Sequence, residues 1–184
     1  MTEASATGTL EQALAYATRL LDRNPALATE QLDEILQVAE GHPAALRLLA
    51  RARSIQGDVP GALQILMPLA QNQPTWALLH FDLGVALGRA GRGQQAIDAL
   101  RRAVALKPDL PQAWRELGDH LLAAGEQEAA DAAYANHVRH STRDPRLIEA
   151  AIALAENRIP TAEGLLREHL KQAPTDVAAI RMFA

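Results

Sequence analysis

The chain has 184 residues, of which 48% are hydrophobic, 22% charged and 3% aromatic, so it is folded rather than disordered. Alanine and leucine dominate the apolar residues, which favours packed helices over sheets. The net charge of -4 lacks the basic excess that nucleic-acid binding needs, and with no cysteine the chain has neither disulfides nor a thiolate site.

The first residues resemble neither a signal peptide nor a membrane segment. They carry no basic region followed by an apolar run, and no apolar run anywhere in the chain approaches the length of a membrane span. We expect residues 1–8 to be a disordered tail. The remainder is expected to be cytoplasmic, with no membrane partner.

Three stretches fall into register when the sequence is shifted by about 34 residues, a period typical of helical repeats. They begin at Pro43, Ala77 and Pro111. Each contains two apolar-periodic segments, which predicts a helical hairpin. The breakers between the two segments lie at 56–58, 90–93 and 124–126.

The pattern continues outward in both directions with lower fidelity. A divergent helix pair precedes Pro43, broken at 23–25, and another pair follows Asp144. We expect about ten helices and a C-terminal stub within one repeat domain, 9–184. Its predicted units are 9–42, 43–76, 77–110, 111–144, 145–174 and a partial unit at 175–184.

The best-fitting unit has Trp114, Leu117, Gly118, Leu121, Ala130 and Tyr134. This pattern resembles the tetratricopeptide repeat family. The resemblance implies an all-α fold, a right-handed superhelical array of antiparallel helix pairs of the solenoid type. The chain departs from the family pattern at His80, which replaces Trp, and at His137 and His169, which replace a small residue.

Small residues within the predicted helices indicate where paired helices approach closely. Ala50, Gly84 and Gly118 occupy the same position in three successive units. Glycine inside a helix costs up to about 1 kcal/mol relative to alanine, so a packing reason is expected. Phosphate binding by these glycines is the weaker alternative, because no strand precedes them.

No catalytic constellation is visible, and we predict a segment that is not an enzyme and that needs no cofactor or metal. His137 and His140 are three residues apart and could face one metal ion, but no carboxylate or cysteine joins them at helical spacing. Packing or surface histidines are the favoured interpretation. A basic cluster at Arg89, Arg92, Arg101 and Arg102 is interpreted as a solvated face, with an anionic partner as the alternative.

The family resemblance implies that the first helices of successive units line a concave groove, with groove residues at the second, fifth, ninth and thirteenth positions of each unit. This surface would suit an extended or helical protein segment with apolar and acidic residues, although simple solvated residues are an equal alternative. The ninth positions carry no Asn, so the chaperone-type carboxylate clamp of the family should be absent. The candidate partner-binding residues are Arg47, Arg51, Phe81, Val85, Arg89, Arg115 and Asp119.

Two further expectations concern the C-terminal side. The stretches 114–122, 143–147 and 174–182 resemble the repeats that precede the catalytic domain of bacterial tetratricopeptide-containing sulfotransferases. The alternative function is therefore the repeat portion of a larger enzyme. In addition, Val177, Ile180 and Phe183 share a helix face with no second partner helix, which predicts weak self-association through 160–184 or fraying of the last helix.

Overall fold

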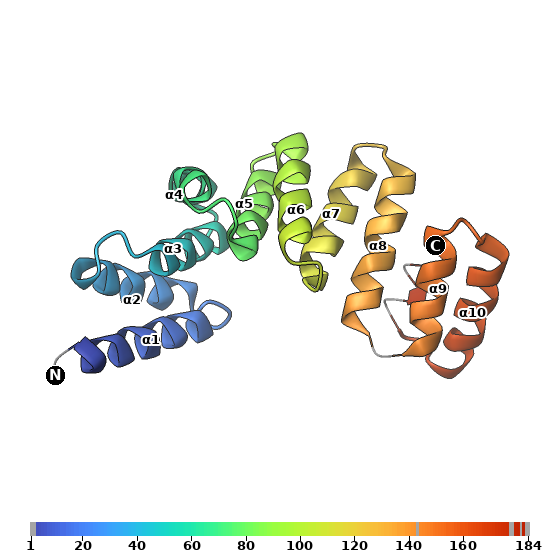
Figure 1. The fold of residues 1–184 in the computed structure, drawn as a ribbon, viewed down its shortest axis with the longest axis horizontal. Coiled ribbons are helices and arrows are strands. Elements are labelled where there is room, and N and C mark those ends of the chain that lie inside the picture. The colour runs from blue at the N-terminus through green and yellow to red at the C-terminus, as the bar shows by residue number, and fades with distance from the viewer. Residues whose placement is uncertain (1–2, 143, 177–178, 181, 183–184) are drawn as a thin grey trace. The chain divides into compact units, whose positions relative to one another are not determined.

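The computed structural model describes residues 3–142, 144–176, 179–180 and 182, with side chains described from residue 10 onward. These residues are all-helical, and the ten helices follow one another along the chain (Figure 1). In chain order the helices are α1 (Glu3–Leu20), α2 (Pro25–Val38), α3 (Pro43–Ile55), α4 (Val59–Asn72), α5 (Ala77–Arg89), α6 (Gly93–Leu106), α7 (Pro111–Ala123), α8 (Gln127–Ser141), α9 (Pro145–Ala155) and α10 (Ile159–Gln172).

These bounds confirm the predicted all-α fold of helix pairs. The breakers at 56–58 and 124–126 lie in connections, while those at 23–25 and 90–93 end on the first residues of α2 and α6. Prolines stand at the starts of α3, α7 and α9, where the missing N–H costs nothing. One difference lies at the N-terminus. Helix α1 begins at Glu3, so it includes most of the residues that we expected to form a tail.

The chain divides into two compact units, Met1–Arg92 and Gly93–Ala184. The division falls between α5 and α6, inside the repeat that the sequence predicts for residues 77–110. Within each unit, helices that are consecutive along the chain pack against one another. Helices α1, α3 and α5, which open successive repeats of the N-terminal unit, are also neighbours of one another, α1 of α3 and α3 of α5.

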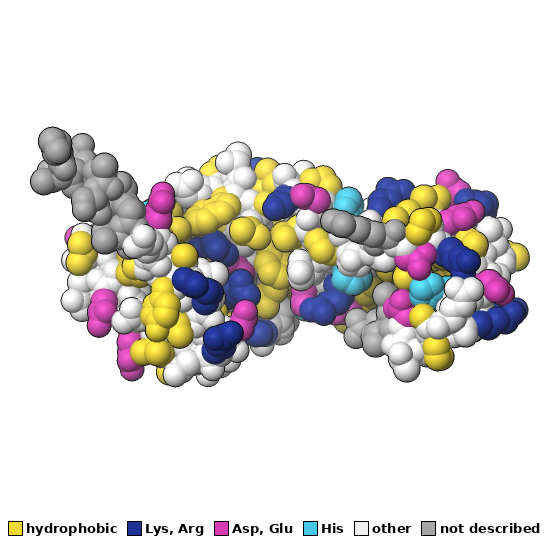
Figure 2. All heavy atoms as spheres, turned by 90° about the horizontal axis from the view of Figure 1, so that it is seen from below, with side chains coloured by type: hydrophobic (Ala, Val, Ile, Leu, Met, Phe, Trp, Pro, Cys, Tyr) yellow, Lys and Arg dark blue, Asp and Glu magenta, His cyan; other side chains and the backbone are white. Residues whose placement is uncertain are grey.

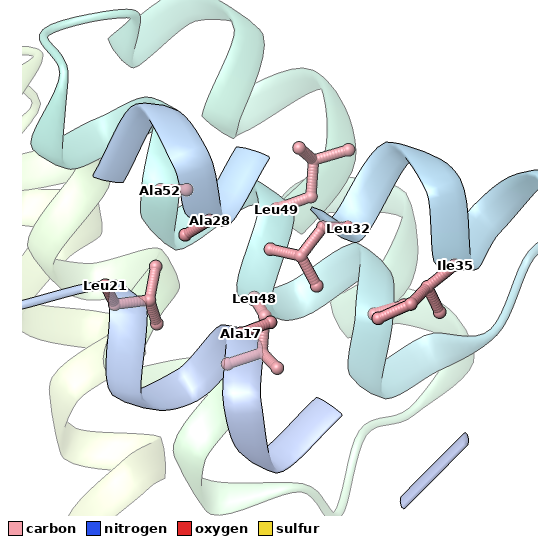
Figure 3. Close-up of a cluster of buried hydrophobic side chains, with 9 residues drawn as sticks. Ala17, Leu21, Ala28, Leu32, Ile35, Leu48, Leu49 and Ala52 are labelled. Atoms are coloured by element: carbon pink, nitrogen blue, oxygen red, sulfur yellow. The ribbon is translucent and has the colours of Figure 1, made fainter. Parts of the chain in front are cut away.

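The core of the N-terminal unit is built from leucine and alanine side chains of three helices. Leu32 from α2 and Leu48 from α3 share one cluster with Ala17 of α1 and with Leu21, the residue that follows α1 (Figure 3). Ala28 is fully buried where α2 approaches α3. Burying a leucine side chain contributes about 1.5–3 kcal/mol, so this alternation of large and small residues holds the first three helices together.

The C-terminal unit has a corresponding core around Leu147, Leu166 and Val138, contributed by α9, α10 and α8. Ala179, which follows α10, is fully buried in this cluster. Ile180 is 45% exposed, while Val177 and Phe183 lie outside the described residues. Self-association through 160–184 therefore stays a prediction.

Turns that close the hairpins use the left-handed backbone conformation. Gly57, Gly91 and Gly125 have φ of 90°, 71° and 79°, and each ends the first helix of its pair. Glycine adopts this conformation without a steric cost. In the last pair Asn157 takes this role with φ of 55°. Within the described part of the chain, no helix combines the length and apolar character that crossing a bilayer requires.

Candidate functional site

A buried ion pair joins the first helices of two successive repeats. Nη1 of Arg47 on α3 donates to Oδ2 of Asp82 on α5 across 2.5 Å, and the two side chains are 12% and 5% exposed. The guanidinium also lies over the ring of Trp76, 5.3 Å from its centroid. The Arg47 guanidinium therefore contacts other residues of this protein and stabilises the pairing of α3 with α5. Its predicted contact with a partner would be a second role.

Burial dominates the electrostatics of Asp82. Removal from water raises the pKa of this carboxyl, and the positive charges of Arg47 and Arg51 lower it by less than burial raises it. The ionised form of Asp82 is therefore less favourable in the folded protein than in water, even beside Arg47. Buried ion pairs often contribute little net stability, but they fix how two elements align.

A second polar link joins the same two helices near their C-terminal ends. Nη1 of Arg89 donates to the carbonyl oxygen of Ser54 at 2.7 Å and to its Oγ at 2.9 Å. The two linked residues are 35 positions apart, as are Arg47 and Asp82. Helices α3 and α5 are therefore tied at two points.

Arg51 lies between these two links and remains accessible. Its side chain is 40% exposed, and its nearest carboxylate, that of Asp22, is 4.0 Å away and 80% exposed. Arg51 follows Arg47 by one helical turn, and Phe81 and Val85 are likewise one turn apart on α5, half-buried. Figure 2 shows dark-blue cationic side chains beside hydrophobic ones on the N-terminal unit. Such a surface can contact carboxylates and apolar groups together.

Two candidate residues belong to the C-terminal unit, on α7. Nη2 of Arg115 donates to Oε1 of its neighbour Glu116 at 2.9 Å, while the buried Nε of Arg115 has no partner among the described residues. Asp119 is exposed and accepts a hydrogen bond from the Tyr134 hydroxyl at 2.8 Å. Both side chains therefore already make contacts within their own unit.

Of the seven predicted residues, five lie in the N-terminal unit on α3 and α5, and two in the C-terminal unit. Sequence reasoning missed Asp82, Ser54 and the contact that Trp76 makes. A signal was available for Asp82, because a lone acidic residue among Leu and Phe in a helix is rarely buried without a partner. The partner itself follows only from the spacing of 35 residues, one more than the repeat.

The histidine departures from the family pattern make specific hydrogen bonds. A ring nitrogen of His80 lies 3.0 Å from the carbonyl oxygen of Pro74, and Trp114 donates from Nε1 to the equivalent oxygen of Pro108 at 2.7 Å. His80 thus replaces Trp in function as well as in position.

In the C-terminal unit, two more histidines are held by oxygen atoms. Nδ1 of His137 lies 2.8 Å from the carbonyl oxygen of Pro111. His169 is 7% exposed and lies between the carboxylates of Asp144 and Asp176, at 3.4 and 2.9 Å. No group of three or more potential metal ligands gathers among the described residues.

Gly118 is a point of close approach between α7 and α8. A Cβ at this position would lie 2.6 Å from Cε1 of Tyr134, closer than real Cβ atoms come. The predicted packing reason for this glycine is therefore confirmed. Gly84 and Ala50, at the equivalent positions, are buried.

Comparisons with known proteins agree with this architecture. Residues 81–145 match the family model described as tetratricopeptide repeat. No curated protein sequence matches the chain significantly.

Among solved structures, the chain is similar to a thermophilic tetratricopeptide repeat protein of Thermus thermophilus, with 21% identity and a TM-score of 0.65 over 95% of this chain and 96% of that one. It is also similar to PilF of Pseudomonas aeruginosa (18% identity, TM-score 0.68, 94% and 80% covered). A third similar structure is MamA (24% identity, TM-score 0.60, 80% and 90% covered). At these identities the likeness shows the fold, and the sulfotransferase alternative stays a prediction.

Proposed function

We propose that this protein of tetratricopeptide repeat fold is a non-catalytic interaction module that binds a partner segment on the α3–α5 face of its N-terminal unit. This face comprises Arg47, Arg51, Phe81, Val85 and Arg89. The carrying observation is the position of Arg51, which presents an exposed charge between two links that hold α3 against α5.

The chemistry of the face favours a segment with acidic and apolar side chains. Arg51 supplies a guanidinium that suits carboxylates, and half-buried Phe81 and Val85 supply apolar surface on the adjacent helix. The two links order the helices before binding, which lowers the entropy lost on association. We therefore assign Arg51, Phe81 and Val85 to the partner, and Arg47 to the frame that holds the face.

The residues of α7 form a weaker candidate contact. Arg115 is 43% exposed, and its Nη2 is held by Glu116, so it presents a charge that is already partly neutralised. Asp119 adds a negative charge one turn later. We propose that these two residues tune the choice of partner and contribute less to affinity than Arg51.

Peptide selection tests the proposal without knowledge of the natural partner. The chain is immobilised and used to select peptides from a displayed random library, and binding of the recovered peptides is measured against Arg51→Glu and Phe81→Ala. We expect peptides rich in acidic and apolar residues whose affinity falls about tenfold or more in Arg51→Glu.

Lys107→Glu is the matched control, because it makes the same charge change at an exposed position of the other unit. An equal loss of peptide affinity in Arg51→Glu and Lys107→Glu would show that binding depends only on the net charge of the chain. Recovery of no peptide that is sensitive to Arg51→Glu would refute the assignment of the face.

A further inference from the structure

A recess in the N-terminal unit lies along α4. It has a volume of about 570 Å³, which exceeds the space needed for a single side chain. We call it the α4 groove. It is lined by Val59, Pro60, Leu63, Gln64, Met67, Pro68, Ala90 and Arg92.

The α4 groove exposes apolar side chains that the core does not use. Helix α4 buries Ala62, Leu63, Leu66 and Leu69. Leu63, at 8% exposure, forms the floor of the groove. Met67, on the groove side, is 40% exposed, and the adjacent Pro68 is also exposed. An apolar recess with solvent-facing side chains is typical of a binding surface.

Two polar groups beside the groove, the Arg92 guanidinium and the carbonyl of Gln64, lack their usual partners among the described residues. Nη1 of Arg92 contacts a thioether, Sδ of Met67 at 3.9 Å, and no described carboxylate lies within ion-pair distance of Arg92. In addition, Pro68 lies inside α4 and has no N–H to donate to the carbonyl of Gln64. A weak sulfur acceptor does not neutralise a guanidinium, so the groove offers an uncompensated positive charge beside apolar walls.

The two ends of the groove carry opposite charges, which would orient a charged ligand. The Asp58 carboxylate caps the first turn of α4, where it accepts from the N–H of Gly61, next to Val59 and Pro60. Arg92 contacts Met67, two turns further along the helix. A ligand carboxylate is therefore favoured at the Met67 end and repelled at the Val59 end.

We propose that the α4 groove binds an amphipathic helix of a partner protein, with apolar side chains along Val59, Leu63 and Met67 and an Asp or Glu side chain on Arg92. Half-buried Val59 and exposed Met67 lie two turns apart on α4 with buried Leu63 between them, so a second helix can place apolar side chains into the groove. No strand edge is available among the described residues, so an added β-strand has no template. This site is separate from the α3–α5 face and does not depend on it.

The test uses the chain with three single substitutions and a displayed random peptide library. Met67→Glu places a negative charge, which would repel the ligand carboxylate, in the exposed apolar wall, and Arg92→Glu replaces the cation by an anion. Gln71→Glu is the control, at an exposed position of α4 that does not line the groove. We expect one class of recovered peptides to lose affinity about tenfold or more in Met67→Glu and in Arg92→Glu, and to bind Gln71→Glu and Arg51→Glu as they bind the unaltered chain.

Two further measurements decide the chemistry of the ligand. Replacing the acidic residue of a recovered peptide by Lys should abolish binding to the unaltered chain and restore it to Arg92→Glu. Circular dichroism should show that the peptide gains helix on binding.

The proposal is overturned if no recovered peptide is sensitive to both Met67→Glu and Arg92→Glu, if the charge swap restores nothing, or if the bound peptide is extended. Peptides that respond only to Arg51→Glu would uphold the α3–α5 face while refuting the α4 groove. The two proposals therefore fail independently.

Discussion

Arg47 and Arg115 occupy the same position in two repeats, yet they make different contacts. Arg47 reaches the acidic residue of the next repeat, Asp82, and the pair is almost fully buried. Arg115 pairs instead with its own neighbour Glu116, and these side chains are 43% and 26% exposed. In both arginines the buried Nε has no partner among the described residues.

The two arginines differ in the residue that stands 35 positions later in the chain. One repeat beyond Arg115, the position that corresponds to Asp82 is Ala150, which is fully buried and offers no acceptor. The same repeat position can therefore link two helices in one unit and remain a surface charge in the other. What decides it is the side chain about one repeat later.

The largest expected effect comes from breaking the buried pair. Asp82→Ala leaves the buried Arg47 guanidinium without its acceptor, which should lower the free energy of unfolding by about 3–5 kcal/mol at about pH 4, where the contribution of Asp82 is complete. Urea denaturation followed by circular dichroism measures this loss. The double variant Arg47→Met with Asp82→Leu removes both charges and should recover most of the lost stability. A double variant as unstable as Asp82→Ala would show that the residues act separately.

The contribution of Asp82 to the free energy of unfolding should also depend on pH. Burial raises the pKa of Asp82, so between the ordinary carboxyl pKa of about 4 and the raised value the folded chain binds more protons than the unfolded chain. The stability that Asp82 contributes is therefore complete below about pH 4 and is lost as pH rises through the raised pKa. Subtracting the pH profile of Asp82→Ala from that of the unaltered chain should give a difference in the free energy of unfolding that is largest at acid pH and falls as pH rises. A rising difference would contradict the dominance of burial.

A smaller effect is expected from the close approach of α7 and α8 in the C-terminal unit. Gly118→Ala forces the Tyr134 ring to move and should lower the free energy of unfolding by about 1–3 kcal/mol. Gly164 lies inside α10, and nothing lies within 4 Å of the place that an added methyl group would take, so Gly164→Ala should instead raise stability by up to about 1 kcal/mol. Thermal denaturation separates the two, and equal signs would show that packing at Gly118 is not the cause.

The turns of the two units offer a further contrast of opposite signs. Gly91→Ala introduces a side chain at φ of 71° and should cost about 1–2 kcal/mol, although nothing lies near the new methyl group. Asn157→Gly relieves the left-handed strain at φ of 55° and should stabilise the C-terminal unit by less than about 1 kcal/mol. Chemical denaturation of both variants checks the prediction, which fails if Gly91→Ala is neutral.

The smallest effect is expected at the exposed pair. Glu116→Gln should change the free energy of unfolding by less than about 1 kcal/mol, because solvent screens the interaction with Arg115. The same denaturation experiment, run beside Asp82→Ala, gives the ratio of the two effects. A loss at Glu116 as large as that at Asp82 would erase the difference between the two units.

The helices and turns could be predicted from sequence because their signals are local. Prolines mark the starts of helices, and Gly57, Gly91 and Gly125 mark their ends through a backbone conformation that other residues resist. Gly118 was also predictable, because a glycine inside a helix needs a packing reason.

The contacts within the candidate site could not be predicted from the sequence as the helices and turns were. The Arg47–Asp82 pair depends on how α3 and α5 align, and no residue of either helix encodes that alignment by itself. The family resemblance implied that Arg47 lies on a ligand-facing surface, but its side chain is only 12% exposed and lies over the ring of Trp76. The α4 groove was missed because its lining combines one helix face with a distant turn residue, Arg92.

We propose that the α3–α5 face of the N-terminal unit binds an acidic, apolar segment. Hydrogen exchange measured with and without a selected peptide tests this proposal, because a bound segment slows local opening where it lies. We expect added protection in α3 and α5 around Arg51 and Val85, and no such protection in Arg51→Glu. Protection confined to other helices, or unchanged by Arg51→Glu, would contradict it.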